Sequence, residues 1–260
     1  RNRSIYDQRY SDYWPARRGD FLAAALEVLA ERQASGASVA YIAEYLFDGL
    51  GARAEALGAL AAAHARGALD LGAQAAYARY LQVDGRWEES LRVVRDLTRA
   101  SPGDAESWAM LLRAHWHLEH ADELAAGLEQ AEEALRAAGA WGEHSIEVLA
   151  LAAGECGLEQ ASAELIDGAI ALHVRSAPDR GIGDGVLSRF YGIKARALAD
   201  LGRTWDAVEA ASGAIVAWGP RQIQRREALE LLESVLAGAA DLPDYVERFE
   251  AGVRASGLEN

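Results

Sequence analysis

The chain has 260 residues, of which 51% are hydrophobic, so it is long enough to bury the core of at least one large domain. Its formal net charge of −14 argues against extended contact with nucleic-acid phosphates or with a negatively charged membrane surface. The single cysteine, Cys156, excludes a disulfide within the chain, and we expect this thiol to be buried.

Alanine supplies much of the apolar content and there are only 5 prolines, a composition typical of helices rather than sheets. No apolar run reaches the roughly 18 residues of a membrane span and no signal peptide is visible, so we expect a soluble domain and favour a cytoplasmic location. Because the chain begins at Arg1, we expect it to be a piece of a longer protein, with any signal or anchor outside it. All basic residues except Lys194 are arginines, a bias that suggests a bacterial source.

The first predicted segment is residues 1–36. Its beginning, residues 1–18, is rich in tyrosine and arginine and is expected to form an arm, and a helix follows at about 20–34. We interpret this segment as an arm with a first helix or a degenerate repeat.

A turn pattern then recurs along the chain. The segment GARAEA at 51–56 is matched by GRWEES at 85–90, and the pattern returns as GRTWDA at 202–207. Glycine supplies the left-handed backbone that ends a helix, and the acidic residue stands in the first turn of the next helix, where the helix dipole favours it. The spacing predicts a repeat of two helices.

The helix after each turn carries small or apolar residues at positions i, i+4 and i+7, which form one stripe along a helix. These positions hold Ala56, Leu60 and Ala63; Ser90, Val94 and Leu97; Leu124, Leu128 and Ala131; Ser162, Ile166 and Ala169; Ala207, Ala211 and Ala214. We expect each stripe to pack against the neighbouring helices.

These turns and stripes resemble the tetratricopeptide repeat family, whose motif forms two antiparallel helices. The resemblance covers roughly 185 of the 260 residues and implies an all-α fold, a right-handed superhelical solenoid of antiparallel helix pairs. It departs from the family's pattern at Glu119, which replaces a turn glycine, and in an insertion at 178–185, so the repeat count holds to within one. The array is predicted to span 37–221, with units at about 37–70, 71–104, 105–138, 143–176 and 188–221, and capping helices in 222–260.

Few residues in this pattern indicate chemistry. In the segment HWHLEH at 115–120, only His115 and Glu119 share a helical face, so we predict no metal site. The glycine-rich loop at 181–185 lacks the Lys-Ser/Thr pair of a phosphate-binding loop. No activated nucleophile is visible, so we predict a protein without cofactor and without enzymatic activity.

In the family, the first helix of each pair lines a concave surface where a ligand peptide lies. The resemblance places on that surface a set rich in arginine and aromatic residues: Tyr41, Tyr45, Arg79, Met110, Arg113, Trp116, His117, Arg189 and Arg196. Because arginine can grip a carboxylate and aromatic rings offer rigid contact area, the hypothesis is a peptide with acidic and apolar side chains. The alternative is that these arginines pair with acidic residues of neighbouring repeats.

The predicted function is therefore a protein-interaction scaffold that binds a peptide or protein partner, as a module of a larger protein. A self-assembly or structural spacer module is the alternative, and an enzyme with a site near 177–187 is a weaker one. The sequence does not indicate the oligomeric state. Sedimentation at two concentrations would separate the first two hypotheses, because only a self-assembly module packs on copies of itself.

Overall fold

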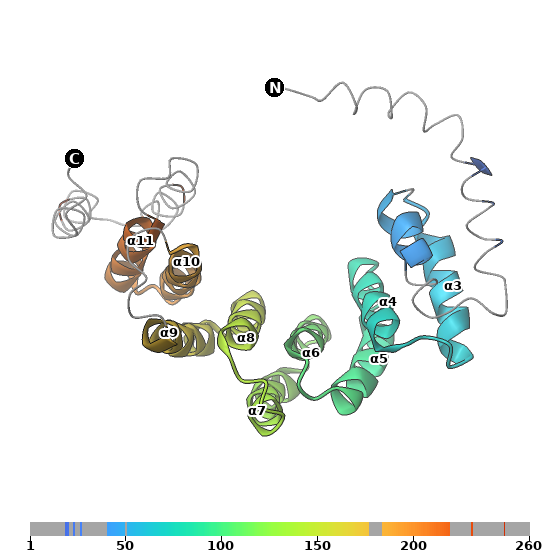
Figure 1. Ribbon diagram of the computed structural model, residues 1–260, viewed down its shortest axis with the longest axis horizontal. Helices are drawn as coiled ribbons and strands as arrows, with labels where there is room; N and C mark the ends of the chain where they lie inside the picture. Colours follow the sequence, from blue (N-terminus) through green and yellow to red (C-terminus); the bar gives the residue numbers. More distant parts are fainter. Residues whose placement is uncertain are drawn as a thin grey trace. The chain divides into compact units, whose positions relative to one another are not determined.

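The computed structural model describes residues 41–49, 51–176 and 184–218, together with six isolated positions, namely Gly19, Asp20, Ala23, Glu27, Glu230 and Glu247. These residues form helices and turns, with no strand among them, so the all-α prediction is confirmed (Figure 1). The predicted arm, most of the helix at 20–34 and the capping helices of 222–260 lie outside the described residues, as do positions 177–183 of the insertion.

The chain divides into two compact units, Arg1–Ser101 and Pro102–Asn260. In the first unit, a helical turn at 41–44 continues into a π-helix that the sequence did not predict. This element and the three α-helices after it pack in chain order: η1 (Tyr45–Gly49), α3 (Arg53–Ala65), α4 (Leu71–Val83) and α5 (Trp87–Ala100).

The described part of the second unit forms three consecutive helix pairs. Within each pair the two helices pack together, and the first helices also pack on those of the next pair, α6 on α8 and α8 on α10. Helix α9 packs on α10 as well, so each pair is covered by its neighbour. The helices are α6 (Ala105–His117), α7 (Ala121–Ala137), α8 (Glu143–Glu155), α9 (Glu159–Ser176), α10 (Gly185–Asp200) and α11 (Thr204–Trp218).

Helix α7 is longer than its counterpart in the preceding pair. It has 17 residues, whereas α5 has 14. Helices α4, α6 and α8 begin at Leu71, Ala105 and Glu143. The distance in sequence from the start of α6 to the start of α8 is therefore longer than that from α4 to α6 by about one helical turn. Most of the extra length between those two units is therefore a continuation of α7 rather than a longer loop.

The stripe residues of the second helices are all buried, as predicted. Two buried serines in these stripes also hold the first helix of their own pair. Ser90 donates to the carbonyl oxygen of Ala78 at 3.0 Å, and Ser162 donates to that of Ala150 at 2.7 Å. In α3 and α11 the same stripe position holds alanine, Ala56 and Ala207, so the serine bond is an addition to the repeat rather than a requirement of it.

The turns also follow the predicted chemistry. Gly51, Gly85 and Gly202 have positive φ angles of 63°, 76° and 71°. Glu119 adopts φ 59° at the corresponding turn although it is not glycine, and its amide donates to the carbonyl oxygen of Trp116. A non-glycine residue in the left-handed region is strained. Glu119 therefore keeps the backbone conformation of the glycine turns but lowers the stability of the fold.

Candidate functional site

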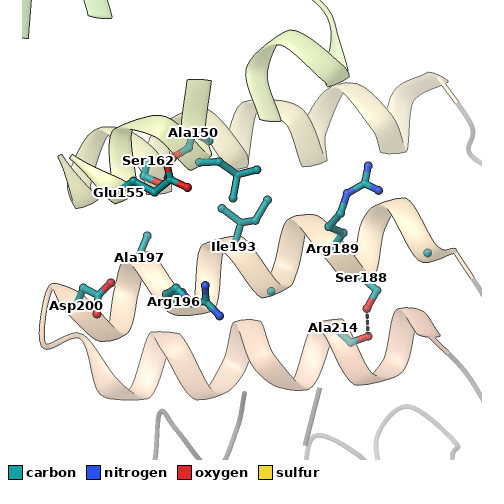
Figure 2. A pocket seen from close by; sticks show the side chains of 14 residues that line it. Ala150, Glu155, Ser162, Ser188, Arg189, Ile193, Arg196, Ala197, Asp200 and Ala214 are labelled. Atoms are coloured by element: carbon teal, nitrogen blue, oxygen red, sulfur yellow. Dashed lines mark hydrogen bonds between the residues drawn. The ribbon is translucent and has the colours of Figure 1, made fainter. Parts of the chain in front are cut away.

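A pocket of about 460 Å³ lies in the second unit, between the first helices α8 and α10 (Figure 2). Residues of α8 form one wall and residues of α10 form the other. Ser162 of α9 and Ala214 of α11 also line it. The pocket is therefore built from two consecutive helix pairs of one compact unit.

The pocket is hollow because the helices around it carry very small side chains there. Ala150 and Gly154 line it from α8, and Gly192 and Ala197 line it from α10. The space behind Gly154 is tight, since a Cβ atom at this position would lie 3.3 Å from the hydroxyl oxygen of Ser162. These residues leave room between α8 and α10 that larger side chains would fill.

The polar groups deep in the pocket are satisfied by the protein itself. Ser162 donates its hydroxyl to Ala150, as described above, and Ser188 donates its hydroxyl to the carbonyl oxygen of Ala214 at 2.7 Å (Figure 2). Both serines are 1% exposed. Because these hydroxyls already donate to backbone carbonyls, the deep part of the pocket suits an apolar group.

Apolar side chains of the first helices also reach solvent, and two of them belong to the lining of the pocket. Leu151 on α8 is 39% exposed, and Ile193 on α10 is half-buried. Trp116, at the end of α6, is 44% exposed and packs edge-on against the ring of His117, with 4.5 Å between the centroids. The first helices therefore present exposed apolar area within the second unit.

Two of the predicted arginines pair with glutamates of the neighbouring helix pair. The Nε of Arg113 on α6 lies 2.6 Å from a carboxylate oxygen of Glu155 on α8. Arg189 on α10 donates from Nη2 to Glu147 on α8 at 2.9 Å, and its Nε contacts the other oxygen of the same carboxylate. For these two residues, the alternative of pairing between repeats is the one that the structure shows.

Arg196 differs from these two arginines. It is exposed, it lines the pocket, and it forms no ion pair with any residue that the structure describes. Asp200, one turn later on α10, is likewise unpaired within the described part of the chain. Figure 2 shows both residues near the Glu155 end of the pocket, with Arg189 near the other end.

The remaining predicted residues do not gather at this pocket. Met110 is 7% exposed, so it is buried in α6 rather than offered to a ligand. Tyr41, Tyr45 and Arg79 belong to the first unit, where Tyr41 is 74% exposed. Arg79 lies over the ring of Tyr80, 5.2 Å from its centroid. Of the nine predicted residues, Arg189 and Arg196 line the pocket of the second unit.

The histidines of segment 115–120 and Cys156, which the sequence raised as candidate reactive groups, do not line this pocket. His115 is buried, and its Nδ1 lies 3.4 Å from that of His120. No group of three or more metal-ligating side chains occurs in the part of the chain that the structure describes. Cys156 is 3% exposed, as expected, and burial raises the pKa of its thiol to about 12.

Among the described helices, none combines the length and apolar character needed to cross a membrane.

Sequence reasoning did not find the small residues that shape the pocket. Gly154 and Gly192 lie inside helices, where glycine is unfavourable relative to alanine by roughly 1 kcal/mol. Glycine within a helix was thus the available signal for a place where space is required. This space becomes a pocket because α8 faces α10. That arrangement depends on packing between helix pairs, which helical spacing does not reveal.

Two solved structures resemble this chain. One is TTC0263, described as a thermophilic TPR protein in Thermus thermophilus: it is 16% identical, the TM-score is 0.50, and the match covers 76% of this chain and 99% of that one. The other is Cut9–Hcn1, a hetero-tetramer of the APC/C, with 10% identity, a TM-score of 0.52 and coverage of 94% and 44%. This chain thus spans less than half the length of that second one.

No family model and no curated protein sequence matches the chain. Because the sequence identity to both solved structures is low, their similarity concerns the fold alone. The order of the helix pairs, the buried stripes and the glycine turns agree with that similarity. The chain has the tetratricopeptide repeat fold, in a divergent form.

Proposed function

We propose that this protein is an interaction scaffold that binds a peptide segment of a partner in the pocket between α8 and α10. The observation that carries this proposal is an open pocket of about 460 Å³ whose lining includes an exposed leucine, Leu151, and an arginine, Arg196, that forms no ion pair with any described residue. Concave sites lined by apolar groups with a few polar ones are where proteins most often bind ligands.

The lining suggests the chemistry of the peptide. An apolar side chain would enter between Leu151 and Ile193 and contact the deep part of the pocket, where the serine hydroxyls are already bonded. Burying one such side chain contributes about 1.5–3 kcal/mol, so a peptide needs further contacts for useful affinity. A carboxylate beside that side chain would pair with Arg196.

The other cations near the pocket support Arg196 as the principal contact. Glu155 and Glu147 already neutralise Arg113 and Arg189, whereas Arg196 has no carboxylate partner among the described residues. The chain as a whole is strongly acidic, with a net charge of −14, so it repels acidic partners elsewhere on its surface. An acidic peptide would therefore depend heavily on this one side chain.

The test is a fluorescence-polarisation screen of the protein against peptides that combine one large apolar residue with acidic neighbours. Charge reversal by Arg196→Glu should weaken any hit at least tenfold. Arg95→Glu is the matched control, because Arg95 is an exposed arginine of α5 in the first unit and should leave the affinity unchanged. Leu151→Ser should also weaken binding, through loss of apolar contact.

Equal affinity of the wild type, Arg196→Glu and Leu151→Ser for every hit would overturn the proposal. Sedimentation velocity at two protein concentrations, run beside the screen, shows whether the pocket is instead covered by another copy of the chain. A concentration-dependent increase in mass that Leu151→Ser abolishes would count against a peptide ligand.

A further inference from the structure

A buried histidine joins three helices of the second unit. His173 lies near the end of α9, and its side chain is 3% exposed. Its Nδ1 lies 2.8 Å from Oε2 of Glu143, the first residue of α8, and its Nε2 lies 2.7 Å from Oδ2 of Asp184, which caps α10. One imidazole therefore links α9 to the beginnings of both helices that form the pocket.

The geometry determines the protonation state of this histidine. An ionised carboxylate only accepts hydrogen bonds, so a ring nitrogen that faces it must carry a proton. A neutral imidazole has one N–H, but His173 faces a carboxylate at each nitrogen. With both carboxylates ionised, the two contacts are satisfied together only by the imidazolium cation, which donates once to Glu143 and once to Asp184.

Asp184 is held in its ionised form. Its Oδ1 accepts hydrogen bonds from the amides of Val186 at 3.0 Å and Leu187 at 3.1 Å, which caps the first turn of α10. Burial alone would raise the pKa of Asp184, but the bonds from His173 and from these two amides outweigh it, so the pKa is lowered. The carboxylate is thus present over the whole neutral range and requires a donor from His173.

We infer that His173 is a pH-dependent link between three helices: as a cation it bonds to both Glu143 and Asp184 and so joins α8, α9 and α10, and on losing its proton it loses the bond to α8. The side chain of Glu143 is 31% exposed and can turn to water, whereas that of Asp184 is 4% exposed and caps α10. The remaining N–H therefore stays with Asp184, and the bond to Glu143 opens first.

Among the residues that the structure describes, the charged groups that face the ring of His173 are Glu143 from α8 and Asp184 from α10. The ring of Phe190, also on α10, packs edge-on with its centroid 6.0 Å away. On α9 itself, the Ser176 hydroxyl lies 3.1 Å from the other oxygen of Glu143 and also contacts the carbonyl oxygen of His173. Deprotonation would thus leave two carboxylates around a neutral ring.

The pH dependence has a defined sign. The hydrogen bond to Asp184, followed by that to Glu143, raises the pKa of His173 above its ordinary value despite burial. A histidine with a raised pKa in the folded protein stabilises the fold below its unfolded pKa of about 6.5, and this stabilisation is lost as the pH rises through the folded pKa. The bond from His173 to Glu143 is therefore present at pH values below the raised pKa of His173 and is lost above it.

Opening would act on the pocket, because both of its walls begin at this cluster. Glu147, one turn after Glu143 on α8, holds Arg189 of α10, and Gly185 and Ser188 follow Asp184 in the first turn of α10. The link therefore sets how the ends of α8 and α10 lie against α9. This inference stands whether or not the pocket binds a peptide, since it concerns the free protein.

The test is nitrogen-15 NMR of the whole chain with labelled histidine. His173 should show two protonated ring nitrogens at pH 6 and should titrate above about 6.5. Its signal is assigned among the 6 histidines by its loss in His173→Gln. In Glu143→Gln the amide can donate to a neutral ring or accept from a charged one, so the pKa of His173 should fall, and the decrease in Tm between pH 6 and pH 9 should be smaller.

Glu143→Gln keeps the experiment decisive even where His173→Gln fails to fold, because Glu143 is partly exposed at a helix end. Assignment then comes from comparing the titration of the two folded proteins. A single protonated nitrogen on His173 at pH 6, or a titration in Glu143→Gln identical to that of the wild type, would overturn the inference.

Discussion

Arg189 and Glu147 hold each other across two neighbouring helix pairs, from positions 42 residues apart in the chain. Two nitrogens of the guanidinium meet the two oxygens of the carboxylate, and the Glu147 side chain is 10% exposed whereas that of Arg189 is 56% exposed. Such a two-point contact fixes the direction of both side chains and joins α8 to α10 beside the pocket.

We expect removal of this contact to weaken the fold slightly. A double-mutant cycle of Arg189→Ala and Glu147→Ala should give a coupling free energy of about 1 kcal/mol, at the upper end for partly exposed pairs, measured by urea unfolding. The pair Arg99–Asp96 is the control, because both of its side chains are exposed and its coupling should be near zero. Equal coupling in the two pairs would contradict the role assigned to the buried glutamate.

The turn at Glu119 offers a stabilising substitution. Glu119→Gly should raise the free energy of unfolding by about 1 kcal/mol, because glycine adopts φ 59° without the steric cost borne by a side chain. The converse change, Gly85→Ala, should lower it by a similar amount, although an added Cβ there would meet no atom within 4 Å. Both are read from the urea midpoint, and a destabilised Glu119→Gly would show that the glutamate side chain contributes to the turn.

The thiol of Cys156 should be inert in the folded protein. Because burial raises its pKa to about 12, the thiolate that reacts with disulfide reagents is scarce below that pH in the native state. We expect little reaction with a chromogenic disulfide reagent at pH 8 and complete reaction of one thiol per chain in urea. Fast labelling of the native protein at pH 8 would show that α8 opens locally around Cys156.

The repeat pattern was predictable because it depends on neighbours close in sequence. Small residues at i, i+4 and i+7 share one helical face, so the stripe from Ser162 to Ala169 could be assigned from spacing alone. The glycine turns were predictable for the same reason, since a positive φ is a local requirement. Burial of the stripes and the φ angles of the turns confirm these predictions.

The candidate site was less predictable because it depends on contacts between pairs. Met110 was assigned to the inner surface from register, but α6 packs against both α7 and α8 and buries it. The partners of Arg113 and Arg189 are each 42 residues away, which no helical periodicity reveals. The same holds for His173, whose two carboxylates come from other helices, 30 and 11 residues away.

Gly154 shows how a single position in one helix pair sets the depth of the pocket. The backbone of α8 passes close behind the pocket, with only a hydrogen atom on that carbon and the Ser162 hydroxyl beyond it. A single added methyl group would lie 3.3 Å from that hydroxyl, so it would make the recess shallower and displace Ser162 slightly, while the charges beside the pocket stayed the same. For the proposed peptide, bulk and charge would thus be selected at separate positions, Gly154 for bulk and Arg196 for sign, so either preference could change without the other.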